Sequence, residues 1–544
     1  DAVYVPSLSK FQLNSYVLQE EGLMFSYNFH NWQKIPWFYN QRSGLPGIFH
    51  NDPIEVTKAL NNMVKSHIIE GSWESVKETP RKFNGHEATH ARFWTGSAEI
   101  LKKFHQYNGD RIGFAQCWVF AGVLITMLRV LGIPSRPVIN AASGDDFEGD
   151  LTIDYEFKNG KVIFKNLNSI WNFHVWVQAS MKRRDLGEKN RGWQEFDPTY
   201  NVGPVSNQVL KNAEIKTDDD IFLYAEVNSD EVFWKNRNVF QTATDKIGIQ
   251  LCTATLNLKT YQDLTFEYKP RERTEKERQH YVKAAESIGI HPVSLGSPRR
   301  RRSVMTTKKT ISLSIVSLEP VYVGDLVNFK IKLGNPTSRI QRLNFTLQVD
   351  SLSYNGHIEH QIKHDSRTEI INPNTNITIP FWITFYEYNN KLMSFETLRI
   401  IASVEDSDGN LYLDTKKISL LTPQLEVKQL KFDAEQIKAR GESIVYGLGA
   451  LSKTNSTFKK NPILVTIKFS KPLLIYLNNA RISIEGNRCE RKTFSIGTIG
   501  PLDHEERKFL LMCTSPNNRE ESLVATLISN EIDGFTGSVF ANTA

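Results

Sequence analysis

The chain of 544 residues is long enough for about three to four domains of ordinary size. Its composition of 40% hydrophobic and 23% charged residues is typical of a soluble globular protein, and a net charge of +6 is too mild to indicate a nucleic-acid-binding protein. Neither a signal peptide nor a membrane-spanning segment is visible, so we expect a cytoplasmic protein or one exported by another route.

Residues 1–294 mix helical and strand patterns and hold every tryptophan except Trp382. Helical spacing predicts a helix over about 53–64. Patterns rich in branched and aromatic residues predict strands at 137–140, 170–179 and 192–196. We therefore expect one large α+β domain with an aromatic core in this part of the chain.

An apolar run over 117–131 predicts a buried helix that Gly132 ends and Pro134 prevents from resuming. Cys117 lies in its first turn, beside unpaired backbone N–H groups and the positive end of the helix dipole. Both favour the thiolate, which is the reactive form of cysteine. A free cysteine is also a common small core residue, so this thiol alone does not indicate an enzyme.

A nucleophilic cysteine needs a base and an orienting partner, and two strands supply candidates. His174 lies within the strand predicted at 170–179, and Asp197 directly follows the strand predicted at 192–196, immediately before Pro198. Neighbouring antiparallel strands could place these side chains together. In isolation each is commoner as a structural residue, His174 as a satisfied strand histidine and Asp197 as a turn carboxylate.

The composition changes abruptly at 295–309, where Gly, Pro and clustered basic residues predict a solvated linker and, as a second reading, a site of regulated proteolysis. From 311 onward hydrophobic residues alternate with polar ones. Two successive all-β domains, at 310–422 and 423–544, follow from the regular spacing of these strands. Cys489 and Cys513 flank a predicted hairpin in the second domain and could pair.

Three blocks identify a family resemblance: Gln116-Cys117-Trp118-Val119-Phe120-Ala121, Trp171-Asn172-Phe173-His174-Val175-Trp176 and Gly192-Trp193-Gln194-Glu195-Phe196-Asp197-Pro198-Thr199. In order and spacing they resemble the animal transglutaminases. The resemblance implies a multidomain α+β protein, with a papain-like core followed by two immunoglobulin-like sandwich or barrel domains. We expect the family's N-terminal β-sandwich to have no counterpart within the residues of this sequence.

The resemblance also implies an activity, in which Cys117 attacks a protein glutamine side chain and His174 and Asp197 assist it. A thioester forms and is resolved by a lysine, a polyamine or water. Trp73 resembles the tryptophan that donates to the oxyanion, while Trp118 and Trp171 resemble residues near the substrate tunnel. Tyr354 resembles the tyrosine by which the first β domain covers the cysteine in the resting enzyme.

Calcium is the cofactor that the resemblance implies, held at two sites. The first site is a loop rich in the hard oxygen ligands that Ca²⁺ prefers. Asn168 lies where the family usually has a carboxylate at this site. The first set is Asp146, Glu148, Asp150, Thr152 and Asn168, and the second is Asn228, Glu272 and Glu277. A third family site is expected to be absent or weakened, because Lys65 lies where oxygen ligands are expected.

Two other function classes remain open on the sequence. One is a catalytically inactive structural or binding protein built on the same scaffold. The other is a glutamine deamidase or cysteine hydrolase, which shares the thiol, imidazole and carboxylate but transfers the acyl group to water. The leading hypothesis is a calcium-dependent transferase whose partners are glutamine- and lysine-bearing proteins and polyamines, with no nucleic acid.

Overall fold

The computed structural model describes residues 52–74, 79–94, 96–131, 133–255, 260–295, 311–317, 320–393, 396–430, 445–446, 461–469, 473–486, 489–504, 506–513, 520–532 and 534–542. The predicted linker, apart from Leu295, lies outside these residues. Among the described residues, no helix combines the length and the apolar character needed to cross a membrane.

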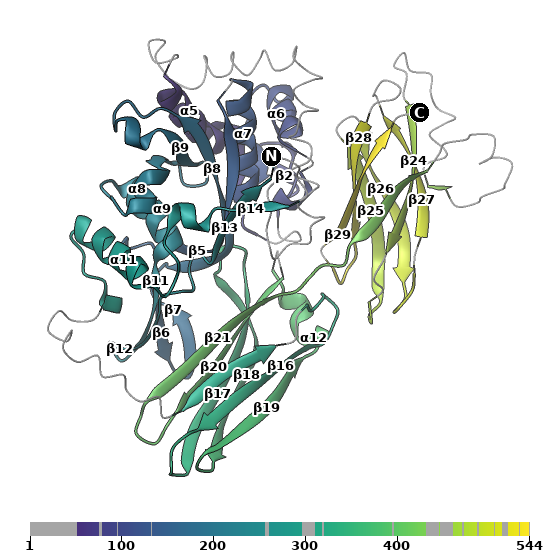
Figure 1. Ribbon diagram of the computed structural model, residues 1–544. Coiled ribbons are helices and arrows are strands. Elements are labelled where there is room, and N and C mark those ends of the chain that lie inside the picture. Colours follow the sequence, from purple (N-terminus) through teal and green to yellow (C-terminus); the bar gives the residue numbers. More distant parts are fainter. Residues whose placement is uncertain are drawn as a thin grey trace.

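Two sheets form the framework of the first part of the chain (Figure 1). The strands of the six-stranded sheet are, in spatial order, β10 (Val202–Ser206), β9 (Gly192–Asp197), β8 (Ser169–Met181), β5 (Ser135–Asp145), β13 (Gln250–Ala254) and β14 (Tyr261–Asp263). Those of the four-stranded sheet are β12 (Asn238–Ala243), β11 (Asp230–Lys235), β6 (Thr152–Lys158) and β7 (Lys161–Phe164). Neighbours in the six-stranded sheet are antiparallel.

Helices cover both faces of the six-stranded sheet, because successive strand residues point to opposite sides. On one face, Phe173 and Val175 pack in a cluster with the central helix α7 (Cys117–Val130). Trp176 points to the other face and packs in a cluster with residues of α8 (Asn207–Asn212), α9 (Asp218–Asn228), α10 (Thr265–Tyr268) and α11 (Glu275–Ser287). Two further helices are α5 (Pro53–Met63) and α6 (Ser97–Gln106).

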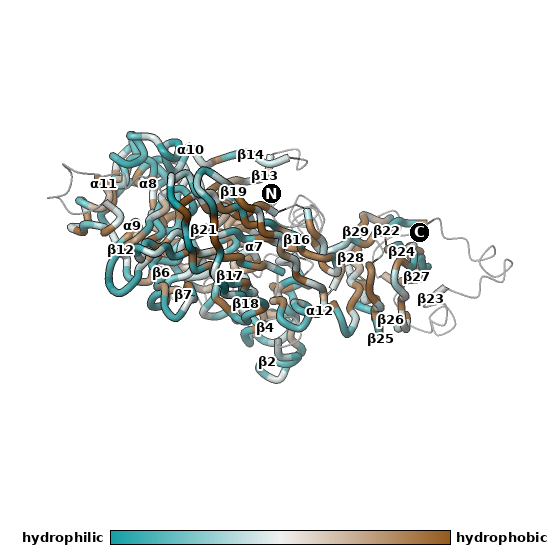
Figure 2. The backbone as a smooth tube through the Cα atoms, turned by 90° about the horizontal axis from the view of Figure 1, so that it is seen from below, coloured by the Kyte–Doolittle hydropathy of each residue, from teal (hydrophilic) through white to brown (hydrophobic). Residues whose placement is uncertain are grey.

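Short elements complete this part of the chain. They are the π-helix Val64–Ile68, the strands β1 (Ile69–Gly71), β2 (Lys82–Phe83), β3 (His86–Glu87) and β4 (Ile112–Ala115), and the 3₁₀ turns Ala91–Phe93, Glu188–Asn190 and Val293–Leu295. β1 and β4 pair in parallel and lead to Trp73 and Cys117 respectively. Hydrophilic loops lie at the periphery, as at β2 and β12 in Figure 2.

Strands dominate the rest of the chain, which forms two modules. The first packs β15 (Ser312–Ser317), β16 (Val327–Asn335) and β19 (Thr375–Ile383) against β18 (Ile358–Ile371), β17 (Gln341–Leu352), β20 (Thr397–Glu405) and β21 (Leu411–Ser419). It also contains α12 (Phe385–Tyr388) and the 3₁₀ turn Asn389–Lys391. Alternating burial along β16 matches the alternation in its sequence.

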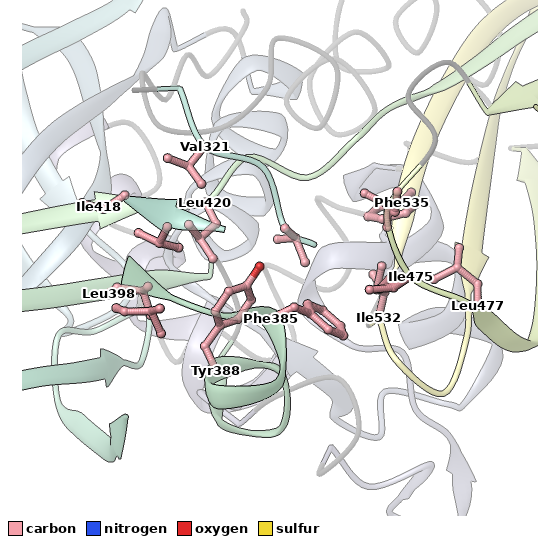
Figure 3. Packing of buried hydrophobic residues seen from close by; sticks show 14 of the residues in the cluster. Val321, Phe385, Tyr388, Leu398, Ile418, Leu420, Ile475, Leu477, Ile532 and Phe535 are labelled. Atoms are coloured by element: carbon pink, nitrogen blue, oxygen red, sulfur yellow. The ribbon is translucent and has the colours of Figure 1, made fainter. Parts of the chain in front are cut away.

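The second module is one sheet of β22 (Leu425–Leu430), β23 (Val445–Tyr446), β24 (Asn461–Phe469), β25 (Leu477–Gly486), β26 (Cys489–Ile499), β27 (Glu506–Cys513), β28 (Glu520–Ile528) and β29 (Phe535–Asn542). The predicted fold class, an α+β core followed by two all-β domains, is thus confirmed. The two modules share one hydrophobic cluster, in which Phe385 faces Ile475 and Ile532 (Figure 3).

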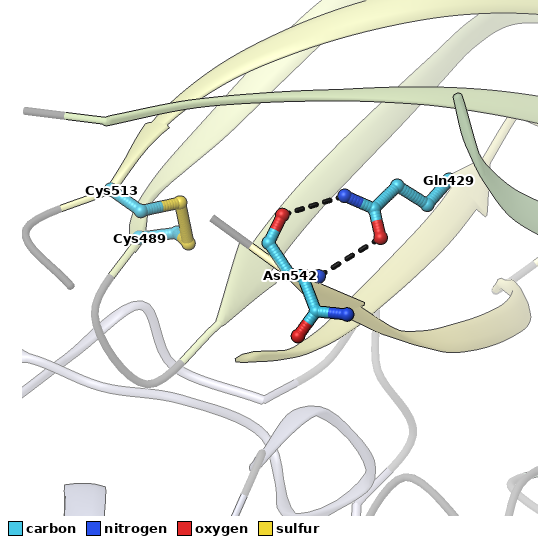
Figure 4. Close-up of a disulfide and its surroundings, with 4 residues drawn as sticks. All are labelled: Gln429, Cys489, Cys513 and Asn542. Atoms are coloured by element: carbon cyan, nitrogen blue, oxygen red, sulfur yellow. Dashed lines mark hydrogen bonds between the residues drawn. A yellow bond between two sulfur atoms is a disulfide. The ribbon is translucent and has the colours of Figure 1, made fainter. Parts of the chain in front are cut away.

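Two side-chain links connect strands of the second module. One is a disulfide, and the other is a pair of hydrogen bonds between its first and last strands. Cys489 and Cys513 form a disulfide between β26 and β27, as the hairpin pattern suggested (Figure 4). The side chain of Gln429 donates to the carbonyl of Asn542 and accepts from its N–H, at 2.6 and 2.9 Å. Cys117 and Cys252 are buried and form no disulfide.

Candidate functional site

Cys117 begins helix α7 directly after strand β4. Gln116 is the N-cap residue, and its side chain donates to the carbonyl of Ser72 at 3.0 Å instead of capping the helix. Ser72 N–H in turn donates to Ala115 O at 3.0 Å, which ties the segment before Trp73 to the helix start. The thiol is completely buried at this junction.

The pairing of β8 with β9 brings His174 and Asp197 together. Val177 is opposite Phe196 in the ladder, and His174 Nε2 lies 2.7 Å from Asp197 Oδ2. The N–H of Thr199 donates to the other carboxylate oxygen at 2.8 Å. Nδ1 of the imidazole has no hydrogen-bond partner within the described part of the chain, so it is the nitrogen available to Cys117. His174 acts to lower the pKa of that thiol.

Burial governs the protonation of this group of side chains. Burial raises the pKa of the Cys117 thiol, against the opposing effect of His174, so the helix N-terminus does not by itself yield a thiolate as the sequence suggested. Burial alone would lower the pKa of His174, but the carboxyl groups of Glu226 and Asp197 outweigh it and hold that pKa well above its ordinary value.

Glu226 is a neighbour of His174 that the sequence reasoning did not single out. It is buried near the end of α9, with Oε1 3.8 Å from His174 Nε2. Ser143 donates to its other oxygen, and Asn140 Nδ2 donates to both Ser143 Oγ (2.7 Å) and Glu226 O (2.8 Å). Burial raises the pKa of Glu226 to about 8. The only signal in the sequence is a carboxylate within an otherwise apolar helical stretch.

Aromatic side chains enclose the thiol. Trp73 and Trp171 meet edge to face with their ring centres 5.1 Å apart. Tyr354 stacks beside Trp73 at 5.9 Å and meets Trp171 and Trp118 edge-on, each at 5.3 Å. The structure therefore gathers the three tryptophans of the predicted oxyanion and tunnel set around Cys117.

Tyr354 comes from the first β module, in the turn between β17 and β18, and its hydroxyl contacts the Sγ atom of Cys117. Its carbonyl accepts from the N–H of Asn172 at 3.1 Å. In the same turn, Gly356 packs against the main chain of Ile170, where an added Cβ would lie 2.0 Å from the carbonyl oxygen. The tip of this hairpin is thus fitted closely to the strand that carries His174.

Oxygen atoms of the first predicted calcium set gather at the loop between β5 and β6. Asp146 accepts from Gly149 N–H at 3.0 Å and also from Leu151 N–H, while Asp150 accepts from the hydroxyl of Thr152 at 2.6 Å. Burial and Asp150 raise the pKa of Asp146 to about 7. Asn168 donates to Thr152 O, and its buried Oδ1 has no partner within the described residues.

These features fit a hard cation at that loop, because crowded carboxyl groups and an unpartnered amide oxygen are Ca²⁺ ligands. Glu148 is mostly exposed. The remaining burial of its carboxyl group and the negative charge of Asp150 raise its pKa.

The second predicted set also converges, though its carboxylates already have cationic partners. Glu272 contacts Lys269, Glu277 contacts Arg278, and Asn228 Nδ2 donates to Tyr224 O at 3.1 Å. Oε2 of Glu272 is buried without a partner within the described residues, which fits an oxygen ligand. At the third family position, Lys65 donates to Thr199 O at 2.6 Å.

Two family models match the chain. The model described as the transglutaminase-like superfamily covers residues 51–198, and that of the transglutaminase family C-terminal ig-like domain covers residues 311–407.

The chain is also similar to curated proteins named protein-glutamine gamma-glutamyltransferase. The chain is 29% identical to protein-glutamine gamma-glutamyltransferase E of Mus musculus, over 86% of this chain and 66% of that protein. It is 30% identical to the hemocyte protein-glutamine gamma-glutamyltransferase of Tachypleus tridentatus, over 72% and 55%. The chain thus spans less than two thirds of the length of these relatives. Among solved structures, red sea bream transglutaminase matches with a TM-score of 0.72 and 22% identity, covering 97% of this chain and 74% of that one, which shows the shared fold.

Proposed function

The chain belongs to the transglutaminase family, and from this we propose that it transfers acyl groups from protein glutamine side chains to amines through a Cys117 thioester. The arrangement of Cys117, His174 and Asp197 carries the proposal, because it supplies a nucleophile, a base and an orienting carboxylate in one buried site. The proposed acyl donors are glutamine-bearing proteins, and the proposed acceptors are protein lysines and polyamines.

In the first half-reaction, Cys117 Sγ attacks the carbon of the glutamine carboxamide while the neutral imidazole of His174 takes the thiol proton on Nδ1. His174 then delivers that proton to the leaving nitrogen, and ammonia departs as the thioester forms. In the second half-reaction, a neutral amine attacks the thioester and loses a proton to His174 as the thiolate leaves. The product is an isopeptide bond when the amine is a protein lysine.

The tetrahedral intermediates need hydrogen-bond donors for their oxyanion. We assign this role to the indole N–H of Trp73 and the backbone N–H of Cys117. Trp171, whose ring centre is 4.8 Å from that of His174, and Trp118 form apolar walls for the amine tunnel. Such walls favour amine over water as the acceptor, which distinguishes the proposed transferase from a hydrolase.

Access to the thiol requires Tyr354 to leave, so the first β module is a lid in this proposal. Calcium would be held by the carboxylates of Asp146, Glu148 and Asp150, the hydroxyl of Thr152 and the amide oxygen of Asn168, and at a second site by Asn228, Glu272 and Glu277. When bound, it would supply positive charge that stabilises these loops.

Incorporation of a fluorescent alkylamine into a glutamine-containing protein tests this proposal, with and without calcium. We expect calcium-dependent incorporation by the wild type and a loss of at least about 10³-fold in Cys117→Ala. Cys252→Ala, which removes the other buried cysteine that forms no disulfide, should leave the rate unchanged. Mass analysis of the product separates the alternatives: glutamate without amine would indicate a deamidase, and no change in a folded protein would indicate an inactive scaffold.

A further inference from the structure

Lys269 places a buried ammonium group within the second predicted calcium set. The residue follows α10 and is 2% exposed. Its Nζ donates to the carbonyl oxygens of Val227 at 2.8 Å and Ile247 at 2.9 Å, and it contacts the carboxylate of Glu272. Three acceptors therefore match the three protons of one ammonium group.

The acceptors around Lys269 are ligands of the kind that a calcium ion takes, namely main-chain carbonyls and a carboxylate. The two carbonyls come from segments that approach each other only because residue 248 is glycine. A Cβ at Gly248 would lie 2.4 Å from Val227 O, and its φ of +58° is in the left-handed region. The fold thus brings the two carbonyl oxygens together at Lys269 Nζ.

The chain's own cations balance the acidic groups here. Arg278 donates to Asp230 at 2.8 Å and contacts Glu277, while Lys269 pairs with Glu272. Unpaired carboxylates at this depth would be costly, so each needs a cation from some source. Only Glu272 Oε2 lacks a hydrogen-bond partner among the described carboxylates of this group.

We propose that Lys269 is a built-in cation that occupies the second calcium site of the calcium-free protein, so that calcium binds there by displacing its ammonium group. The inference rests on the calcium binding in the proposed function and deepens it. Binding becomes an exchange of one cation for another, in which Val227 O, Ile247 O and Glu272 pass from the ammonium group to the metal. The ammonium group must then move out to solvent.

Calcium titration by calorimetry tests the exchange on the full chain. Lys269→Met keeps the length of the side chain but removes the competing charge, and we expect calcium to bind this site about tenfold or more tightly. Lys283→Met is the matched control, since it removes a positive charge from the surface of the neighbouring helix α11, and its affinity should equal that of the wild type. Glu272→Gln identifies which binding event belongs to this site.

A second measurement uses the wild-type chain, in case Lys269→Met does not fold. An amine-acylating reagent and peptide mass spectrometry report the reactivity of each lysine. We expect Lys269 to react at least about fivefold faster in calcium than in chelator, with Lys283 as internal reference. Unchanged Lys269 reactivity at saturating calcium, or unchanged affinity in a folded Lys269→Met variant, would overturn this inference alone. Wild-type protein that binds no calcium would overturn the calcium proposal as well.

Discussion

At the scale of single residues, the site combines a buried thiol with an aromatic cover. Cys117 is shielded by Trp73, Trp118 and Tyr354, and the shielding accounts for the raised pKa of the thiol. Tyr354 thus blocks access to the thiol, although its hydrogen bond to Cys117 by itself lowers the pKa of that thiol. Removing its hydroxyl should therefore release part of this restraint.

We predict that Tyr354→Phe increases the rate of Cys117 alkylation by iodoacetamide in calcium-free solution by about fivefold to tenfold. The physical reason is the loss of one buried hydrogen bond, which contributes about 1 kcal/mol to the covered arrangement. Peptide mass spectrometry measures the rate. Tyr388→Phe is the matched control, because its hydroxyl donates to Asp325 O at 2.9 Å within the same module and far from the thiol in the sequence. Equal rates for all three proteins would contradict the role given to Tyr354.

At the scale of elements, strands β8 and β9 position the proposed catalytic pair, His174 and Asp197, and are tied to the neighbouring helices by Glu195. This carboxyl group of β9 accepts from Trp176 Nε1 (2.9 Å), the hydroxyl of Tyr268 (2.8 Å) and Gln178 Nε2 (2.9 Å). Burial raises the pKa of Glu195 to about 7. The folded protein therefore retains a proton that the unfolded chain has already lost.

The sign of the resulting pH dependence follows from linkage. Because the pKa in the folded protein lies above the ordinary value of 4.5, the contribution is fully present below pH 4.5 and is lost as the pH rises to about 7. Between pH 5 and pH 7, Glu195→Gln should remove about 2 kcal/mol of this pH dependence from the unfolding free energy of the core. Denaturant unfolding at pH 5 and pH 7 measures it, with the exposed Glu188→Gln as control. If the unfolding free energy of Glu195→Gln changes between pH 5 and pH 7 as much as that of the wild type, Glu195 does not carry this proton.

The disulfide is a second element-scale feature, since it staples β26 to β27 across a separation of 24 residues. Replacing both cysteines by serine should destabilise the second module by about 3 kcal/mol, because closing a loop of this size restricts the unfolded chain. Thermal unfolding of the double variant should match that of reduced wild type. A double variant as stable as the oxidised wild type would contradict a stabilising role.

The sequence predicted much at this scale and missed what depends on three-dimensional contacts. The helix that starts at Cys117, the strands of His174 and Asp197 and the alternation of the β modules follow from local patterns. Glu226 could not be assigned, because only the packing of α9 against the sheet brings it to His174. Likewise, the helix position of Cys117 predicted a reactive thiolate, whereas burial has the larger effect and raises its pKa.

At the scale of the whole molecule, polar contacts join the first β module to the core around the lid. Asn172 Nδ2 donates to Thr397 Oγ1 at 2.8 Å, and Lys417 Nζ donates to Ile170 O at 3.0 Å. Arg92 and Glu396 form an ion pair at 3.0 Å whose side chains are only 8% and 10% exposed. Exposing polar contacts to water costs less free energy than exposing apolar ones, because water replaces their hydrogen bonds. Polar contacts therefore suit an interface that opens.

Breaking the Arg92–Glu396 pair should favour opening. We predict that Arg92→Leu, which leaves Glu396 without this partner at the interface, raises Cys117 alkylation in calcium-free solution by about tenfold or more. The double variant Arg92→Leu with Glu396→Leu should lie closer to the wild type, because both members of the ion pair are then removed together. The same alkylation assay reports both. An unaltered rate in Arg92→Leu would exclude this pair from the closing contacts.

In the proposed function the cover and the nucleophile belong to one polypeptide, so the β17–β18 turn would act as a tethered inhibitor. Its local concentration at the thiol is set by the chain and is of millimolar order for short flexible connections. A detached copy of the first β module, added at micromolar concentration, could not match it. On this proposal, we expect inhibition by the module to be independent of dilution and to end when the module moves away from the thiol or when a substrate of very high affinity displaces it.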